Sequence, residues 1–176
     1  FSGPIGCGIA AVREKLEENL SSSGYKTHHI KISDYLKTCL SEKIVNVSHQ
    51  ETSDRADRYI RLQEAGNMMR EKQGDILAEY AIKKIAEIRA EDLPARTAYI
   101  IDQLKHQDEV NLLRAVYGNL FYLFGVLSTA GRRASRLQSE GVGESRISEL
   151  ISRDRKQTEK YGQQLDKTLQ LADFFV

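Results

Sequence analysis

The chain opens with a loop whose glycine spacing is that of a phosphate-binding loop. Its eight residues are Gly3, Pro4, Ile5, Gly6, Cys7, Gly8, Ile9 and Ala10. Gly3 and Gly8 occupy the glycine positions of the P-loop pattern G-x-x-x-x-G-K-[ST]. Glycine tolerates positive φ and close approach of the backbone, so N–H groups of the loop can surround an anion where the next helix begins. We expect these eight residues to bind nucleotide phosphates; a tight turn without a ligand is the alternative.

The last two positions of this loop depart from the P-loop pattern. Ile9 stands where a lysine would reach the β- and γ-phosphates, and Ala10 stands where a hydroxyl would bind magnesium. Phosphoryl transfer normally uses both groups. The sequence therefore predicts a nucleotide site that senses rather than reacts. Arg13, one helical turn after Ile9, is a candidate substitute cation, and a solvated helix residue is the alternative.

An acidic residue closes a short apolar segment in the middle of the chain. The segment Tyr99-Ile100-Ile101 is typical of a buried strand, and Asp102 follows it. In a parallel sheet the carboxyl ends of the strands face the ligand crevice. We therefore expect Asp102 to lie beside the glycine loop, where a carboxylate holds magnesium through water, with Lys105 and His106 near the same crevice. A helix cap or turn is the alternative.

Arginines are concentrated after residue 130. Arg136 lies beside both Arg132 and Arg133 on one helix face, and Arg153 and Arg155 follow. Clustered guanidinium groups are suited to clamping phosphate. We expect Arg132 and Arg136 to contact the nucleotide from a lid like that of nucleotide kinases, although a solvated amphipathic face would have the same pattern.

A zinc motif is present only in part. His49-Gln50-Glu51 matches the H-x-E element of zinc deaminases, which also requires the sequence P-C-x-x-C. Cys7 and Cys39 both precede it, and neither is followed by that spacing. The tripeptide is therefore predicted to be a chance match in a loop, and we expect no metal ligand or catalytic residue from it.

Alternating strands and helices must position these residues. Apolar periodicity predicts strands at 25–32, 97–101 and 119–127, and a last one that opens at Asp173. It predicts helices at 9–20, 54–72, 76–90, 109–117, 129–138, 144–157 and 160–171, and a short helix capped by Ser33 and Asp34. Residues 41–54 are predicted to form a loop, and Pro94 is predicted to end the helical region before it. The segment 119–127 is apolar throughout, as in a strand covered on both faces. This alternation favours an α/β domain with a mostly parallel sheet.

Length and charge narrow the choice of partners. The chain has 176 residues, enough for one ordinary domain, and a formal net charge of +1 with 29% charged residues. We therefore expect no DNA partner and no membrane partner. Two cysteines without metal or redox spacing favour a reduced, cytoplasmic compartment. Because a P-loop normally follows a strand and the chain ends on an apolar segment, we expect a piece of a longer polypeptide.

Several segments together resemble one protein family. They are the loop of residues 3–10, Ile32-Ser33-Asp34-Tyr35-Leu36, Leu62-Gln63-Glu64-Ala65-Gly66-Asn67, Gly74-Asp75-Ile76-Leu77-Ala78, Tyr99-Ile100-Ile101-Asp102-Gln103-Leu104-Lys105-His106, Glu109-Val110, Leu112-Leu113-Arg114 and Leu171-Ala172-Asp173-Phe174-Phe175-Val176. The combination, which covers essentially the whole chain, resembles the amino-terminal nucleotide-kinase-like P-loop domain of bacterial deoxycytidylate deaminase-related proteins, several of which act in anti-phage defence.

The resemblance implies a fold and a partner. The fold would be a three-layer α/β/α P-loop NTPase domain spanning residues 1–176. A zinc-dependent domain that deaminates dCMP or dCTP would follow Val176, so that zinc and the hydrolase activity belong to that domain and to no residue of this chain. The departures at Ile9 and Ala10 argue against kinase activity.

Three functions are consistent with these residues. The preferred hypothesis is a regulatory domain that binds ATP, GTP or a dNTP, with or without Mg²⁺, and biases an attached deaminase within a homo-oligomer. The alternatives are an active nucleotide kinase and a structural module for oligomerisation or partner binding. A regulatory RNA or protein partner stays open.

Overall fold

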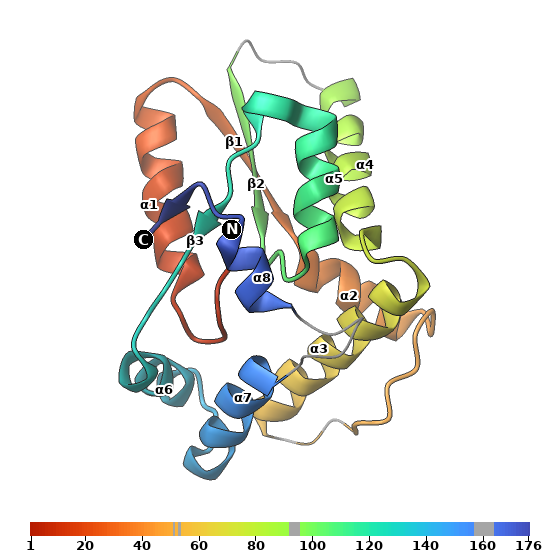
Figure 1. The fold of residues 1–176 in the computed structure, drawn as a ribbon, viewed down its shortest axis with the longest axis vertical. Coiled ribbons are helices and arrows are strands. Elements are labelled where there is room, and N and C mark those ends of the chain that lie inside the picture. The colour runs from red at the N-terminus through yellow and green to blue at the C-terminus, as the bar shows by residue number, and fades with distance from the viewer. Residues whose placement is uncertain (51, 53, 92–95, 157–163) are drawn as a thin grey trace.

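A computed structural model describes residues 1–50, 52, 54–91, 96–156 and 164–176, without the side chains of 154–156. The helices are α1 (Ile9–Ser22), α2 (Ile32–Ser41), α3 (Arg55–Lys72), α4 (Ile76–Glu91), α5 (Gln107–Tyr117), the 3₁₀ turn η1 (Gly118–Leu120), α6 (Ala130–Ser139), α7 (Glu144–Lys156) and α8 (Leu165–Gln170). The strands are β1 (Lys26–Lys31), β2 (Thr97–Asp102), β3 (Phe124–Gly125) and β4 (Phe174–Phe175). The protein is a mixed α/β structure with small parallel sheets (Figure 1).

The strands form two parallel pairs. β1 pairs with β2 over six residues, from Lys26 opposite Thr97 to Lys31 opposite Asp102. β3 pairs with β4 over two residues. Because both strands of a pair run in the same direction, their carboxyl ends lie at the same edge of the pair.

The first two residues of the chain lie between the two pairs. On one side, the nitrogen of Phe1 donates to the oxygen of Ile101 at 2.7 Å. On the other side, Ser2 donates to the oxygen of Phe124 at 2.9 Å and accepts from the nitrogen of Val126 at 2.8 Å. The order across the strands is thus β1, β2, residues 1–2, β3, β4. After residues 1–2, the chain first forms β1 and β2 on one side of them and then β3 and β4 on the other side. The strand order therefore reverses direction at residues 1–2, where the glycine loop begins.

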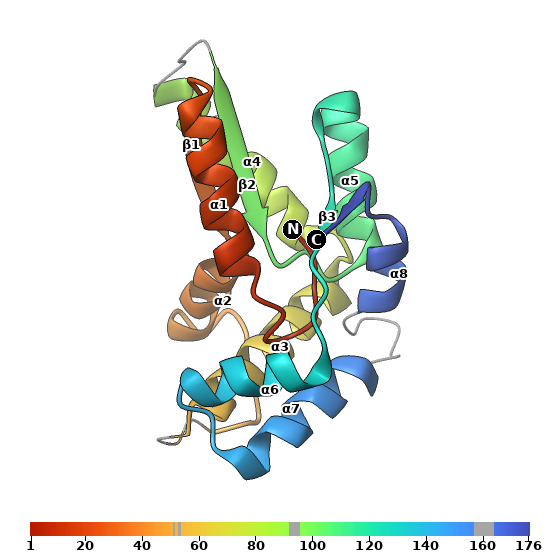
Figure 2. The same ribbon diagram turned by 90° about the vertical axis from the view of Figure 1, so that its left-hand side faces the viewer.

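Helices cover the strands and gather beyond their carboxyl ends. Figure 2 shows α1 on one side of β1 and β2, and α4 and α5 on the other. In Figures 1 and 2, α2, α3, α6 and α7 lie beyond the carboxyl ends of the strands, on the side where the glycine loop turns into α1. α1 contacts both β1 and β2, α2 packs on α3, and α3 packs on α7.

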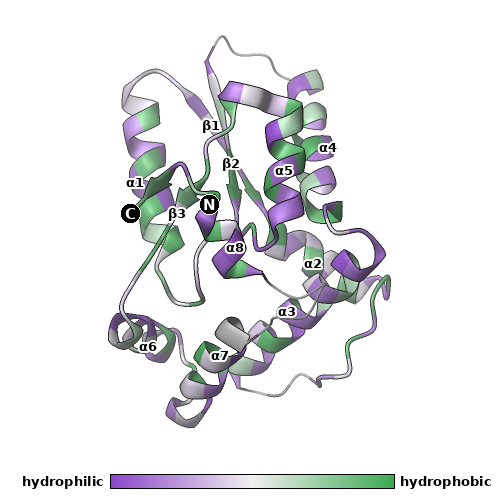
Figure 3. Cartoon of the chain, viewed as in Figure 1, coloured by the Kyte–Doolittle hydropathy of each residue, from purple (hydrophilic) through white to green (hydrophobic). Residues whose placement is uncertain are grey.

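The residues that the structure describes form a core of three apolar clusters. The largest joins the strands to α2, α3, α4 and α5, and its fully buried members include Leu77, Leu104 and Leu113. Hydrophobic residues run through β2 at the centre of the molecule in Figure 3. A second cluster joins α3, α6 and α7. A third lies under α1 and holds the start of the chain against β2 and β3. The helices beyond the strand ends therefore have a core of their own beside the glycine loop.

The predicted strand over 119–127 is wrong for its first half. Gly118, with φ of 55°, turns the chain into η1, and only Phe124 and Gly125 form β3. Leu120 is 85% exposed and Tyr122 is 58% exposed. The apolar run does not reflect burial on two faces, because its first residues form η1 and the side chains of Leu120 and Tyr122 are exposed.

Most other element predictions are confirmed within a few residues. The helix predicted at 54–72 begins one residue later, and Asp54 caps it through a hydrogen bond from the Ala56 nitrogen at 2.8 Å. The predicted cap at Ser33 and Asp34 is wrong, because α2 already begins at Ile32 and Asp34 lies in its first turn. Outside the described residues lie Glu51, Pro94, the first part of the helix predicted at 160–171, and the side chain of Arg155.

A carboxylate ties α3 to α7 and to the segment before α3. Asp57 accepts hydrogen bonds from Thr52, from His49 Nε2 at 2.7 Å and from Arg146 Nη2 at 2.9 Å. The bonds from Thr52 and His49, and then that from Arg146, hold the pKa of the Asp57 carboxyl far below its ordinary value. The ionised form is therefore favoured in the folded protein.

The stability of the protein should fall in acid because of Asp57. A carboxyl whose pKa is depressed by folding stabilises above its unfolded pKa, about 3.9, and loses that contribution as the pH falls further. Urea unfolding at about pH 7 and about pH 3 should therefore show a smaller pH effect for Asp57→Asn than for the unaltered protein. The exposed Asp166→Asn is the matched control, and an equal acid effect in both variants would contradict this assignment.

Candidate functional site

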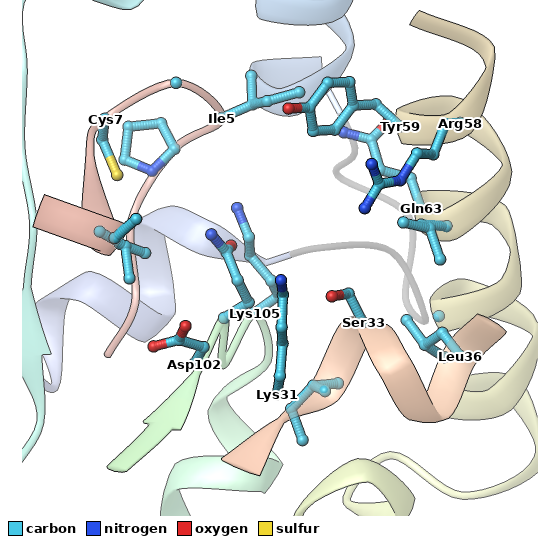
Figure 4. A pocket seen from close by; sticks show the side chains of 18 of the residues that line it. Ile5, Cys7, Lys31, Ser33, Leu36, Arg58, Tyr59, Gln63, Asp102 and Lys105 are labelled. Atoms are coloured by element: carbon cyan, nitrogen blue, oxygen red, sulfur yellow. The ribbon is translucent and has the colours of Figure 1, made fainter. Parts of the chain in front are cut away.

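A cavity of about 330 Å³ opens beyond the carboxyl ends of β1 and β2. Four groups of residues line it: the glycine loop and first turns of α1 (residues 4–10 and Arg13), the end of β1 with α2 (His29, Lys31, Ile32, Ser33, Leu36), α3 (Arg58, Tyr59, Leu62, Gln63, Gly66, Arg70), and Asp102, Gln103, Lys105, Arg136 and Glu140. Figure 4 shows Ile5, Cys7 and Tyr59 on one side of this cavity and Lys31, Ser33 and Asp102 on the opposite side.

The glycine loop is a turn, closed by one backbone hydrogen bond, that leads into α1. Gly6 has φ of 74° and Gly8 has φ of 95°, both in the region that favours glycine. The Cys7 nitrogen bonds to the Pro4 oxygen at 3.1 Å, and Gly8 is the residue before α1. The first N–H groups of a helix lack partners within the helix and carry partial positive charge. Seven of the eight predicted loop residues line the cavity, while Gly3 lies buried at its start.

The two residues that depart from the P-loop pattern have different surroundings. The Ile9 side chain is 4% exposed and belongs to the apolar cluster under α1, with Phe1, Ile100 and Val126. Ala10 is exposed and carries no polar group. Position 9 thus contributes to the core instead of supplying a charge.

Asp102 lies beside the loop, where the end of β2 was predicted to place it. Its Oδ2 lies 2.6 Å from His29 Nε2 and 3.9 Å from Arg13 Nε. Its Oδ1 is buried and has no hydrogen-bond partner among the residues that the structure describes. One oxygen of this carboxylate is therefore directed to a neighbour on β1.

Arg13 is held by acids of its own helix. Its guanidinium bonds to Glu17 at 2.5 Å and to Glu14 at 3.1 Å. These carboxylates, together with Asp102, balance its charge, although it lines the cavity. The positive charge of Arg13 is therefore largely neutralised by these carboxylates and contributes little attraction for a phosphate.

Two arginines of α6 bind carbonyl oxygens of the glycine loop. Arg133 Nε donates to the Ile5 oxygen at 2.7 Å, and Arg136 Nη1 donates to the oxygens of Cys7 at 2.7 Å and Gly6 at 3.2 Å. Carbonyl oxygens of the loop thus point toward α6. Arg136 was predicted at the site, whereas the contact made by Arg133 was not foreseen.

Two other arginines of the predicted lid do not reach the cavity. Arg132 is exposed on α6 and is not among the lining residues. Arg153 pairs with Glu64 at 2.9 Å and joins α7 to α3. Of the lid arginines whose side chains are described, only Arg136 lines the cavity.

Lys105 reaches from the end of β2 to the start of the loop. Its Nζ donates to the Gly3 oxygen at 2.6 Å, and the residue is only 6% exposed. Its backbone nitrogen donates to Glu109 Oε2 at 2.8 Å. Gln103, with φ of 65°, makes the sharp turn between Asp102 and Lys105. The sequence placed Lys105 near the crevice but gave no signal of the contact with Gly3.

The wall opposite the loop carries cations that the sequence analysis missed. Lys31 closes β1 and Arg58 lies in the first turn of α3, and both line the cavity. Within the described ranges neither has an ion-pair partner closer than 4.0 Å. The rule that strand ends face the crevice, which found Asp102, would also have found Lys31. Arg58 is a single charge in a helix rich in charges, so its role had no sequence signal.

A tyrosine and a glutamate connect α3 to α6 at the rim of the cavity. The Tyr59 hydroxyl donates to Glu140, and both residues line the cavity. Burial, and then the hydrogen bond to the Glu140 carboxylate, raise the pKa of Tyr59 well above its ordinary value. The hydroxyl therefore stays protonated and keeps the two helices joined.

His49, the histidine of the partial zinc motif, has a structural role. His49 bonds to Asp57, and both Cys7 and Cys39 are buried in apolar clusters. Across the described ranges, no three His, Cys, Asp or Glu residues are placed to hold a metal ion. Within the same ranges no helix is both long and apolar enough to cross a membrane.

No protein-family model matches the chain, and no curated protein matches it.

Proposed function

We propose that the glycine loop and the cavity beside it bind the phosphates of a nucleotide. The observation that carries the proposal is the position of residues 4–10: they line a cavity at the carboxyl ends of parallel strands, at the point where the winding changes direction. Ligands of open α/β sheets bind at such points. The start of α1 adds N–H groups that attract an anion.

The charges around the cavity support an anionic ligand. Of the described residues that line it, six are cationic: Arg13, Lys31, Arg58, Arg70, Lys105 and Arg136. Only Asp102 and Glu140 are acidic. Arg13 and Arg70 are balanced by carboxylates of α1 and α5, whereas Lys31 and Arg58 have no ion-pair partner among the described residues. Such an excess raises the local concentration of an anion and stabilises it once bound.

The arrangement of elements supports a nucleotide-kinase-like fold for residues 1–176. The segment that carries the loop has β2 on one side and β3 on the other, and α1 lies on the opposite side of the strands from α4 and α5. We infer from this a three-layer α/β/α domain of the P-loop class, in which α6 is the start of the lid. The short β3 and β4 would be the less regular edge of its sheet.

Asp102 is suited to hold magnesium with the phosphates. Magnesium is commonly bound by one or two carboxylates together with phosphate oxygens and water. The buried Oδ1 of Asp102, which lacks a partner in the described part of the chain, fits this requirement. Ala10 supplies no hydroxyl for the metal, so Asp102 would act through water and would not complete a reactive site.

The proposed role is regulatory. The resemblance given above suggests that nucleotide binding here biases an attached zinc-dependent dCMP or dCTP deaminase in a homo-oligomer, in defence against phage and in the cytoplasm. The absence of both the lysine and the hydroxyl of a reactive P-loop supports binding without turnover.

One observation favours phosphoryl transfer as a second function. The cavity continues from the loop to Lys31 and Arg58, which could hold a second phosphorylated molecule opposite the first. Transfer of a phosphate from ATP to an added nucleoside monophosphate by the purified chain would favour this function over the regulatory one.

Calorimetric titration tests the proposal. ATP, GTP and each dNTP are titrated with Mg²⁺ into the purified chain, with the corresponding nucleosides as matched ligands without phosphate. We expect at least one nucleotide to bind and its nucleoside to bind at least about tenfold more weakly, because charged hydrogen bonds to phosphate contribute about 1.5–3 kcal/mol each. Equal affinity for nucleotide and nucleoside, or no binding of any nucleotide, would overturn it.

A further inference from the structure

We propose that Lys105 supplies the loop with the phosphate-directed ammonium group that position 9 lacks. This inference rests on the proposed function, since it assigns a residue to the same site. It concerns a lysine that comes from the end of β2, about one hundred residues away from the loop in the sequence but adjacent to it in space.

The first step is that a cation cannot come from position 9. The Ile9 side chain is committed to the cluster with Phe1, Ile100 and Val126 and is 4% exposed. A charge placed there would lose its hydration among apolar side chains, which is costly. The chain therefore uses position 9 for packing, and a phosphate-directed charge has to come from another element.

The second step is that the Lys105 ammonium already lies at the loop. Its Nζ is 2.6 Å from the oxygen of Gly3, the first residue of the glycine pattern, and Lys105 lines the cavity together with residues 4–10. Figure 4 shows the Lys105 side chain directed into the cavity from the side of Asp102. The ammonium group is therefore close enough to the loop to contact a phosphate bound there.

The third step is that Lys105 is held in place before any ligand binds. Its backbone nitrogen and that of His106 both donate to Glu109 Oε2, at 2.8 Å and 3.2 Å. Glu109 is itself fixed by Arg70 at 2.8 Å. Gln103 holds a left-handed φ of 65°, a conformation that costs energy and is found where a functional geometry requires it. A pre-positioned cation loses less entropy on binding a ligand than a mobile one does.

The other cations near the loop are less suited to this role. Arg13 is paired with Glu14 and Glu17. Arg136 bonds to carbonyl oxygens on the outer side of the loop, at Gly6 and Cys7. Lys105 differs from both, because it contacts the start of the loop from the strand end that also carries Asp102, so that a cation and a magnesium-binding carboxylate lie three residues apart.

Pyrophosphate binding tests this assignment without assuming a base. Lys105→Met keeps the length of the side chain and removes its charge, and Lys105→Gln keeps a polar donor for the Gly3 oxygen. Both should weaken pyrophosphate binding by at least about thirtyfold, the usual minimum for loss of one partner of a buried charge pair. Lys105→Arg should restore part of the affinity. Lys15→Met is the matched control, because Lys15 is exposed on α1 and does not line the cavity. This variant should bind pyrophosphate as tightly as the unaltered chain does.

The outcomes separate this inference from the proposed function. If the unaltered chain binds neither pyrophosphate nor any nucleotide, the phosphate site itself is wrong. If it binds them and both uncharged Lys105 variants bind as well, the site stands and the role of Lys105 is overturned. Circular dichroism must show that the variants are folded. Should they unfold, pyridoxal phosphate with borohydride on the unaltered chain decides: labelling of Lys105 that pyrophosphate blocks supports the role, and labelling without protection overturns it.

Discussion

Glu109→Gln should lower the free energy of unfolding by about 3–5 kcal/mol, the usual cost of removing one partner of a buried ion pair. Glu109 is fully buried at the start of α5. It accepts from Arg70 Nε at 2.8 Å and from the backbone nitrogens of Lys105 and His106. A glutamine has the same size but leaves the Arg70 guanidinium without its counter-charge, because Arg70 is only 3% exposed. Chemical denaturation in urea measures the change.

Matched variants distinguish this effect from a general cost of substitution. Glu71→Gln makes the same change at an exposed position of α3 and should shift stability by less than about 0.5 kcal/mol. The double variant Arg70→Met with Glu109→Gln removes both charges and should recover part of the loss, since a neutral pair is cheaper to bury than a lone charge. If Glu109→Gln were as mild as Glu71→Gln, the pair would not hold the β2–α5 connection, and Lys105 would not be pre-positioned as we infer.

The elements that position the site could be predicted where their residues carry a local signal. The helix after the glycine loop, the strand before Asp102 and the helix at 54–72 all follow from periodicity and residue type within a short window. The same reasoning failed at 119–122, because the chain turns at Gly118 into η1 and the side chains of Leu120 and Tyr122 are exposed.

The walls of the cavity depend on contacts that no local pattern contains. Lys105 and Gly3 are far apart in the sequence and meet only because residues 1–2 lie between β2 and β3. Arg58 lines the cavity because α3 packs beyond the strand ends. The arginines of α6 are all suited to bind phosphate by residue type, but they differ in position: Arg136 contacts the loop, whereas Arg132 is exposed to solvent. Long-range packing, not residue type, selects among the candidates.

The conformation of the loop itself is the second place where a small change should have a large effect. Gly6 has φ of 74°, and a Cβ added there would lie 2.9 Å from the backbone oxygen of Arg133 and 3.2 Å from Leu137 Cγ. We expect Gly6→Ala to cost about 1–3 kcal/mol in backbone strain and a similar amount in overpacking against α6. Because the loop must move away from α6, pyrophosphate and nucleotide binding should fall by at least about tenfold.

Two other glycines separate the causes of this loss. Gly24 has φ of 80° but open space around its Cβ position, so Gly24→Ala measures the backbone strain alone. Gly131 lies in α6 with open space and without a positive φ, so Gly131→Ala should stabilise the helix by up to about 1 kcal/mol. Urea unfolding and calorimetry on all three variants should give the largest losses for Gly6→Ala. If Gly6→Ala cost no more stability than Gly24→Ala and left binding unchanged, close contact between the loop and α6 would not be needed to form the phosphate site.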